Sequence, residues 1–128
     1  AGASPDVTAD ALVSAPLDDI AADLVALLEV IRPSLVVGYD DAGGYGHPDH
    51  VRMHDATVAA CRATGTPLAE IVSQPADSVE WFALEHRQPA VASALHAHST
   101  QVQVDGDDVV HSGGQRHAIP TSVGLRRR

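Results

Sequence analysis

The sequence predicts an α/β fold in which a Rossmann-like parallel sheet is flanked by helices. Two observations lead to this prediction. An apolar run at 34–39 lies between two segments whose apolar residues recur at helical spacing. A loop at 40–46 that contains three glycines joins this run to the second segment. The order helix, buried strand, loop, helix is typical of parallel α/β sheets, which bind their ligands beyond the carboxyl ends of the strands.

The first helix is expected to begin at Pro16 and to end at Arg32-Pro33. Residues 1–15 show no sustained period and are expected to be irregular. Proline suits the first turn of a helix because it lacks the N–H that would be unpaired there. Acidic residues in the same turn suit the helix dipole. One apolar face follows, made of Ile20, Leu24, Leu27, Leu28 and Ile31.

The second helix is expected to begin at His47 or Pro48 and to end near Arg62. The segment after it, 67–74, fits a short helix and a strand equally well. Apolar and polar residues alternate over 78–84, which predicts a strand.

The C-terminal third is predicted to contain a helix that begins at Pro89 and a β-hairpin over 102–110. The hairpin is indicated by the turn dipeptide Asp105-Gly106, which has valines on both sides. Residues 112–128 are expected to be irregular, and the basic run 126–128 is expected to be a solvated tail rather than a binding patch.

Length and composition limit the functions that the chain can have. Its 128 residues fit one domain, 1–128, with a light core because only 3% of the residues are aromatic. The net charge of −9 argues against a nucleic-acid or anionic-membrane partner, and no apolar stretch is long enough for a membrane span. The single cysteine, Cys61, favours a reducing compartment, the cytoplasm. The expected partner is therefore a small molecule.

The loop and the start of the second helix concentrate side chains that bind metals or transfer protons. His50 and His54 are four residues apart and would project from one helix face, as paired zinc ligands do. His47 precedes the helix, and Asp49 is placed to accept a proton from an imidazole N–H. Tyr45 offers a phenol that can hold an oxyanion. With a metal that lowers the pKa of its bound water to about 7, these groups suit hydrolysis of an amide or ester.

Structural interpretations compete for three of the candidate residues. His54 fits a solvated helix residue better than a metal ligand, and His98, alone on a helix face, fits a packed side chain. Asp40 fits a turn residue, although it is placed where it can support the site. For the cluster at 45–54 as a whole, a functional site is favoured over a purely structural turn, because such a turn does not need so many polar side chains within ten residues.

These residues resemble the zinc-dependent N-acetylglucosaminyl deacetylase family, which includes the GlcNAc-phosphatidylinositol de-N-acetylases and enzymes of mycothiol metabolism. The resemblance covers residues 15–62 and 88–120. The matching stretches are Ile31-Arg32-Pro33, Val36-Val37-Gly38-Tyr39-Asp40, Gly43-Gly44-Tyr45-Gly46-His47-Pro48-Asp49-His50 and Ala94-Leu95-His96-Ala97-His98-Ser99-Thr100-Gln101. The glycine before His47 makes the loop most similar to that of the deacetylases acting on N-acetylglucosaminyl-inositol.

The resemblance implies a metal-dependent hydrolase that removes the N-acetyl group from an N-acetylglucosaminyl substrate of the inositol type. One zinc ion per site would activate the water, with His50 as a ligand and His54 as an additional candidate. His47, held by Asp49, would stabilise the oxyanion or protonate the leaving amine, and Tyr45 would contact the acetyl carbonyl. Two further residues are expected to line the site or bind substrate: His98 and Asp40.

One element of the family is missing from this sequence. In the family the first strand ends in Ala-His-Pro-Asp-Asp, which supplies two further zinc ligands and the general base. One histidine does not hold a catalytic zinc ion, which takes about three protein ligands. The chain is therefore expected to be either the C-terminal part of a longer deacetylase or a catalytically incomplete module for binding or assembly. The open sheet edge of such a part would favour homo-oligomers.

Two weaker interpretations remain. The metallo-β-lactamase-like hydrolases carry a His-x-His-x-Asp-His run after a strand, but Tyr45 stands in place of the first histidine and the helical segments do not suit that strand-rich class. The histidines of the loop and helix could also bind metal adventitiously, without turnover.

Overall fold

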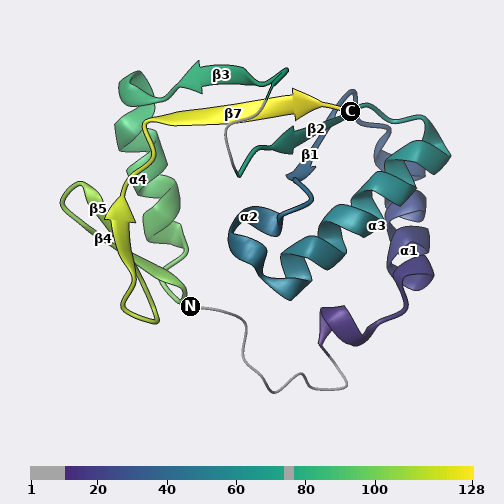
Figure 1. Cartoon of the computed structure of the whole chain (residues 1–128), viewed down its shortest axis with the longest axis horizontal. Helices are drawn as coiled ribbons and strands as arrows, with labels where there is room; N and C mark the ends of the chain where they lie inside the picture. The colour runs from purple at the N-terminus through teal and green to yellow at the C-terminus, as the bar shows by residue number, and fades with distance from the viewer. Residues whose placement is uncertain (1–10, 74–76) are drawn as a thin grey trace. The chain divides into compact units, whose positions relative to one another are not determined.

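The computed structural model describes residues 11–73 and 77–128 (Figure 1). Its Cα atoms group into two compact units. The loop unit comprises the described residues up to Glu80 together with Gly124–Arg128, and the hairpin unit comprises Trp81–Val123. Of the predicted irregular segment 1–15, residues 1–10 lie outside the described residues, and Leu12–Ser14 form a short 3-10 helix, η1. The expected single domain over 1–128 stays a prediction.

Two long helices of the loop unit confirm the helical spacing in the sequence. Helix α1 (Leu17–Ile31) follows Pro16, and Arg32 ends it in a left-handed conformation with φ of 50°. Helix α3 (Pro48–Thr64) begins after His47 and ends at Gly65, which also has a positive φ. In Figure 1, α1 lies behind α3. Among the described residues, no helix is both long and apolar enough to cross a membrane.

The sheet of the loop unit begins with two parallel strands, which confirms the α/β prediction. Strand β1 (Val36–Tyr39) pairs with β2 (Leu68–Ile71), so that Val36 lies opposite Leu68. This pairing shows that residues 68–71 of the ambiguous segment 67–74 form a strand, and Gln74 lies outside the described residues. The third strand, β7 (Ser122–Arg127), pairs antiparallel with β2, so the sheet is mixed. Strand β3 (Glu80–Ala83), most of which belongs to the hairpin unit, confirms the strand predicted over 78–84.

Strand β1 is covered on one face. Gly38 faces α3, because a Cβ added there would lie 3.5 Å from the Thr57 methyl group. Val37 and Tyr39 alternate onto the other face and are exposed. The prediction of a buried strand is therefore wrong in part, because β1 is half-buried on its α3 face and exposed on the other. The core of this unit is light, as expected, and its small members include Ala56, Ala60, Cys61, Leu68 and Ala69. Burial raises the pKa of the Cys61 thiol.

A buried carboxylate on β2 corrects the prediction for the C-terminal segment. Glu70 is fully buried, and its carboxylate accepts hydrogen bonds from Arg126 Nη2, at 3.1 Å, and from Arg128 Nε. The register places Arg126 directly opposite Glu70. The prediction of an irregular segment 112–128 ending in a solvated basic tail is therefore wrong. Two arginines of that run compensate the buried charge, which the sequence alone does not reveal because the partner lies 56 residues away.

The hairpin unit contains the predicted helix and hairpin, and one further strand. Helix α4 (Gln88–Ala97) follows the 3-10 helix η2 (Glu85–Arg87). Strands β4 (Val102–Asp105) and β5 (Asp108–His111) form the predicted hairpin, and Gly106 adopts φ of 59° in its turn. Strand β6 (Arg116–Ala118), which the sequence did not predict, pairs with β5. The described core of this unit contains Val109 and Ile119.

Candidate functional site

A glycine turn connects the carboxyl end of β1 to the start of α3. Gly43–Gly46 form one short helical turn, α2, in which Gly43, Gly44 and Gly46 have positive φ. A Cβ on Gly43 would lie 2.8 Å from the Val51 backbone nitrogen. Position 43 therefore requires a glycine for two reasons: its φ is 62°, and α3 approaches too closely for a Cβ. This turn brings the loop carbonyls against the first turn of α3.

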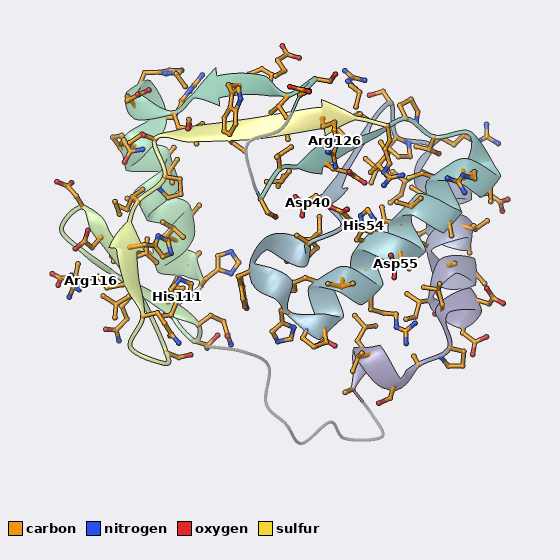
Figure 2. All side chains as sticks on the ribbon, viewed as in Figure 1. Asp40, His54, Asp55, His111, Arg116 and Arg126 are labelled. Carbon is orange, nitrogen blue, oxygen red and sulfur yellow. The ribbon has the colours of Figure 1, made fainter. Side chains whose placement is uncertain are left out.

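Asp40 anchors the start of the loop. Its carboxylate is buried and accepts hydrogen bonds from the Ser73 hydroxyl at 2.7 Å and the Ser73 backbone N–H at 2.6 Å. Burial acts to raise the pKa of this carboxyl, but the hydrogen bonds from Ser73, Gly44 and Ala42 outweigh burial and lower the pKa below its ordinary value. Asp40 is therefore a charged clamp between the loop and the segment after β2 (Figure 2). This placement favours support of the loop, and a role in substrate binding stays a prediction.

His47 caps the N-terminus of α3. Its Nδ1 accepts a hydrogen bond from the Asp49 backbone N–H at 3.1 Å. Because Nδ1 is the acceptor, the neutral ring carries its proton on Nε2. The expectation that the Asp49 carboxylate accepts a proton from the His47 ring is wrong, because the contact is made by the Asp49 backbone N–H. That carboxylate instead accepts a hydrogen bond from the Val13 N–H at 3.1 Å and so ties η1 to α3.

His50, on the first turn of α3, has the opposite tautomer. Its Nδ1 lies 3.2 Å from the Gly43 carbonyl oxygen. A carbonyl only accepts, so Nδ1 carries the proton and Nε2 keeps its lone pair. A backbone carbonyl that holds one ring nitrogen while the other stays available is the arrangement that metal-ligating histidines show.

The rings of four residues around this turn form one aromatic cluster. His47 stacks on His50 with ring centroids 4.8 Å apart. Tyr39 stacks on His50 at 4.3 Å, with the two planes 8° apart. Tyr45 presents its edge to His50 at 5.4 Å and to His47 at 6.0 Å, and it is 66% exposed. The predicted site residues Tyr45, His47 and His50 are therefore brought together. The sequence analysis assigned no role to Tyr39.

His54 is a packed residue of the α3–sheet interface. It is 6% exposed, and its Nδ1 lies 2.9 Å from the Tyr39 carbonyl oxygen and 3.3 Å from Glu70 Oε1. Figure 2 shows His54 between α3 and the strands, with Arg126 on the neighbouring strand. The prediction of a solvated helix residue is therefore wrong, because the ring is buried. Its contacts give His54 a packing role rather than that of a metal ligand.

A complete zinc site is not assembled by the residues that the structure describes. No three His, Cys, Asp or Glu side chains among them converge as metal ligands. Within this limit His50 fits as a single zinc ligand, because its Nε2 lone pair is available and its tautomer is fixed by the Gly43 carbonyl.

His98 belongs to the hairpin unit, whereas the aromatic cluster belongs to the loop unit. It follows the last turn of α4, is exposed, and its backbone carbonyl accepts hydrogen bonds from the N–H groups of Gln101 and Val102. Its predicted role in lining the site stays a prediction.

Known proteins match the part of the chain that carries this cluster. Residues 5–61 match the family model described as GlcNAc-PI de-N-acetylase (PIG-L). The 1D-myo-inositol 2-acetamido-2-deoxy-alpha-D-glucopyranoside deacetylase of Rhodococcus jostii is 44% identical over 52% of this chain and 23% of the relative. The deacetylases of the same name from Mycobacteroides abscessus and Actinosynnema mirum are 37% and 30% identical, over 76% and 88% of this chain.

The chain spans only part of the length of these relatives: 47% of the Mycobacteroides abscessus deacetylase and 50% of the Actinosynnema mirum deacetylase. A solved structure, a deacetylase–teicoplanin complex from teicoplanin biosynthesis, aligns with 98% of this chain and 55% of its own, with a TM-score of 0.52 and 16% identity. This likeness shows the α/β fold alone. Residues 5–61 are therefore similar to the GlcNAc-PI de-N-acetylase family, and this matched part contains the aromatic cluster.

Proposed function

We propose that this chain supplies the proton-transfer and oxyanion-binding part of a zinc-dependent N-deacetylase site. The observation that carries the proposal is the opposite polarity of two stacked imidazoles. His50 keeps a lone pair on Nε2, whereas His47 carries a proton there, and their ring centroids are 4.8 Å apart. One ring is thus prepared to bind a cation and the other to donate a hydrogen bond, which is the pair of functions that amide hydrolysis at a metal needs.

The substrate class follows from the relatives, which are named as deacetylases of an N-acetylated glucosaminyl-inositol. We propose an N-acetylglucosaminyl substrate of the inositol type for this chain. A bound zinc ion would supply a Lewis acid and an activated water. His50 is the ligand that the described residues offer, and further ligands are needed for a catalytic zinc.

His47 is proposed to act on the acetyl group. Its Nε2–H would donate to the carbonyl oxygen as negative charge develops on it. To give a proton to the leaving amine, the ring would first have to be protonated on Nδ1, which breaks the hydrogen bond from the Asp49 N–H. The Asp49 backbone N–H fixes the ring orientation, because it holds Nδ1 at 3.1 Å. The exposed Tyr45 phenol would contact the same carbonyl oxygen from the open side of the cluster.

The test is the release of free amine from N-acetylglucosaminyl-inositol, with added zinc, by the chain fused behind a segment of a relative that carries the family's Ala-His-Pro-Asp-Asp element, because the described residues alone do not complete a zinc site. We expect turnover of the fusion that saturates with zinc and that His50→Ala abolishes, because a metal ligand is gone. His96→Ala, at an exposed histidine on α4, is the matched control and should retain the rate. Turnover that His50→Ala leaves intact would overturn the proposal.

A second candidate is a non-enzymatic binding or assembly module. It is favoured by the observation that the described residues bring no three metal-ligand side chains together. The same assay separates the two candidates. Binding of the substrate without release of amine, at saturating zinc, would support the module and contradict the enzyme. A cytoplasmic location and self-association stay predictions under either candidate.

A further inference from the structure

A second pair of histidines lies on the three-stranded sheet of the hairpin unit. His111 ends β5 and His117 is the middle residue of β6. The register places His117 opposite Val109, two residues before His111, so both imidazoles project from the same face of the sheet. Arg116 alternates onto the other face, where it pairs with Asp105 and Asp108 at 2.8 and 3.0 Å. Figure 2 shows Arg116 and His111 on different sides of these strands.

The two imidazoles meet through their outer nitrogens. The Nε2 atoms of His111 and His117 are 2.8 Å apart on the exposed surface. His117 Nδ1 lies 2.9 Å from the Ala118 carbonyl oxygen, so it carries the proton and leaves a lone pair on its Nε2. In the neutral pair, His111 Nε2–H therefore donates to His117. One proton occupies the place between two nitrogen ligands.

We propose that the His111–His117 pair is a metal site in its own right, specific for a divalent ion with tetragonal coordination, Cu²⁺ before Ni²⁺ and Zn²⁺. The metal replaces the shared proton, and the proton of His111 moves to its Nδ1 so that both Nε2 atoms become ligands. The neutral imidazole is a preferred ligand of these ions, and their affinities follow the order Zn²⁺ below Cu²⁺. The proposal does not depend on the proposed deacetylase function.

The type of ligand decides between the ions. Two neutral imidazoles bind Cu²⁺ more tightly than Ni²⁺ or Zn²⁺ by the general order of affinities, and Cu²⁺ and Ni²⁺ prefer nitrogen ligands in square-planar or tetragonal sites. Metal–nitrogen bonds of 2.0–2.1 Å place two ligands about 2.9 Å apart at a right angle. The two nitrogens, now 2.8 Å apart in a hydrogen bond, lie near that spacing.

The rings must tilt for the metal to enter. Their centroids are 5.0 Å apart and their planes differ by 42°, so the two nitrogens now point at each other. A tilt of exposed rings turns both lone pairs toward a common point. A cavity of about 290 Å³ beside His111, lined by Ser99, Gln101 and Ser112 among others, has room for the water molecules that complete the coordination.

The experiment is a titration of the full chain with Cu²⁺, followed by calorimetry and by electron paramagnetic resonance. We expect one Cu²⁺ per chain with two nitrogen ligands at this site. His111→Ala, His117→Ala and the double variant should each weaken this binding by at least about tenfold and to the same extent, because a single imidazole does not chelate. His86→Ala, an exposed histidine of η2 in the same unit, is the matched control.

Two results would overturn the proposal. Cu²⁺ binding that both single variants leave unchanged would show that the pair holds no metal. Binding that disappears only in His47→Ala or His50→Ala would assign the metal to the aromatic cluster instead. Circular dichroism of each variant establishes that it is folded. As a second readout, Cu²⁺ should raise the thermal midpoint of the wild type and not that of the double variant.

Discussion

The two histidine pairs of this chain differ in where their outer ring nitrogens point. In the loop unit, His47 and His50 stack face to face, and backbone groups fix Nδ1 of each ring. In the hairpin unit, a backbone carbonyl fixes Nδ1 of His117, and the Nε2 atoms of His111 and His117 point at each other on the exposed surface. The donor and the acceptor nitrogen of the first pair are thus offered to a ligand, whereas those of the second pair meet in one hydrogen bond.

The largest effect expected is on turnover. His47→Asn should lower kcat by about 10²–10³-fold, because the donor to the developing oxyanion is lost. Asparagine still accepts the Asp49 N–H as a good N-cap residue, so the free energy of unfolding should stay near the wild-type value. His111→Asn is the counterpart in the other pair and should retain the rate. Equal losses in both variants would erase the functional difference between the pairs.

The next effect concerns the buried carboxylate of Glu70 in the loop unit. Replacing Arg126 and Arg128 together by alanine should lower the free energy of unfolding by about 3 kcal/mol, because Glu70 is left buried and uncompensated. Arg116→Ala, which removes exposed ion pairs of the hairpin unit, should change it little. Urea titrations followed by circular dichroism make the comparison. A double variant as stable as Arg116→Ala would contradict the role given to Glu70.

Alanine at Gly43 in the loop unit and at Gly106 in the hairpin unit should lower the free energy of unfolding by different amounts. Gly43→Ala should destabilise the chain by about 2 kcal/mol, because alanine is strained at φ of 62° and its Cβ meets the Val51 backbone. Gly106→Ala, at φ of 59° with open space around it, should lose about 1 kcal/mol from the φ strain alone. Equal unfolding midpoints in urea would mean that α3 moves away from Gly43 without cost.

The smallest effect expected is in acid. The folded pKa of Asp40 lies below its unfolded value, so this carboxylate stabilises the chain fully above the unfolded pKa of about 3.9, and the stabilisation is lost as the pH falls through the folded value. Asp40→Asn should remove this acid-dependent part and about 1 kcal/mol at neutral pH. Ser73→Ala removes one of the two Ser73 donors, so its free energy of unfolding should lie between those of the wild type and Asp40→Asn. Identical stability profiles from pH 6 to pH 3, measured by thermal unfolding, would contradict the clamp.

Local patterns predicted much of the fold and the centre of the site. Helical spacing located α1 and α3, and the dipeptide Asp105-Gly106 located the β4–β5 hairpin. The concentration of Tyr45, His47 and His50 at the loop and helix start was enough to predict that these side chains lie near one another. These features depend on neighbours within a few residues, which is why the sequence carries them.

Long-range pairings were beyond the same reasoning. The role of Arg126 depends on Glu70, 56 residues away, and it becomes visible only when β7 lies beside β2. His111 and His117 face each other because of the register of β5 against β6. Strand β6 has too few residues to be predicted from the alternation of apolar and polar residues. Spacing alone also made His54 a metal-ligand candidate. Its true partner, the Tyr39 carbonyl, is 15 residues away in sequence, so the local pattern does not reveal it.

The burial of Cys61 makes the chain well suited to site-directed labelling. It is the single cysteine of the sequence, 4% of its surface is accessible, and burial holds its thiol in the unreactive protonated form at neutral pH. A cysteine introduced at an exposed position would therefore react alone with a maleimide fluorophore or spin label. Motions of either unit can be followed in this way without first removing a native thiol.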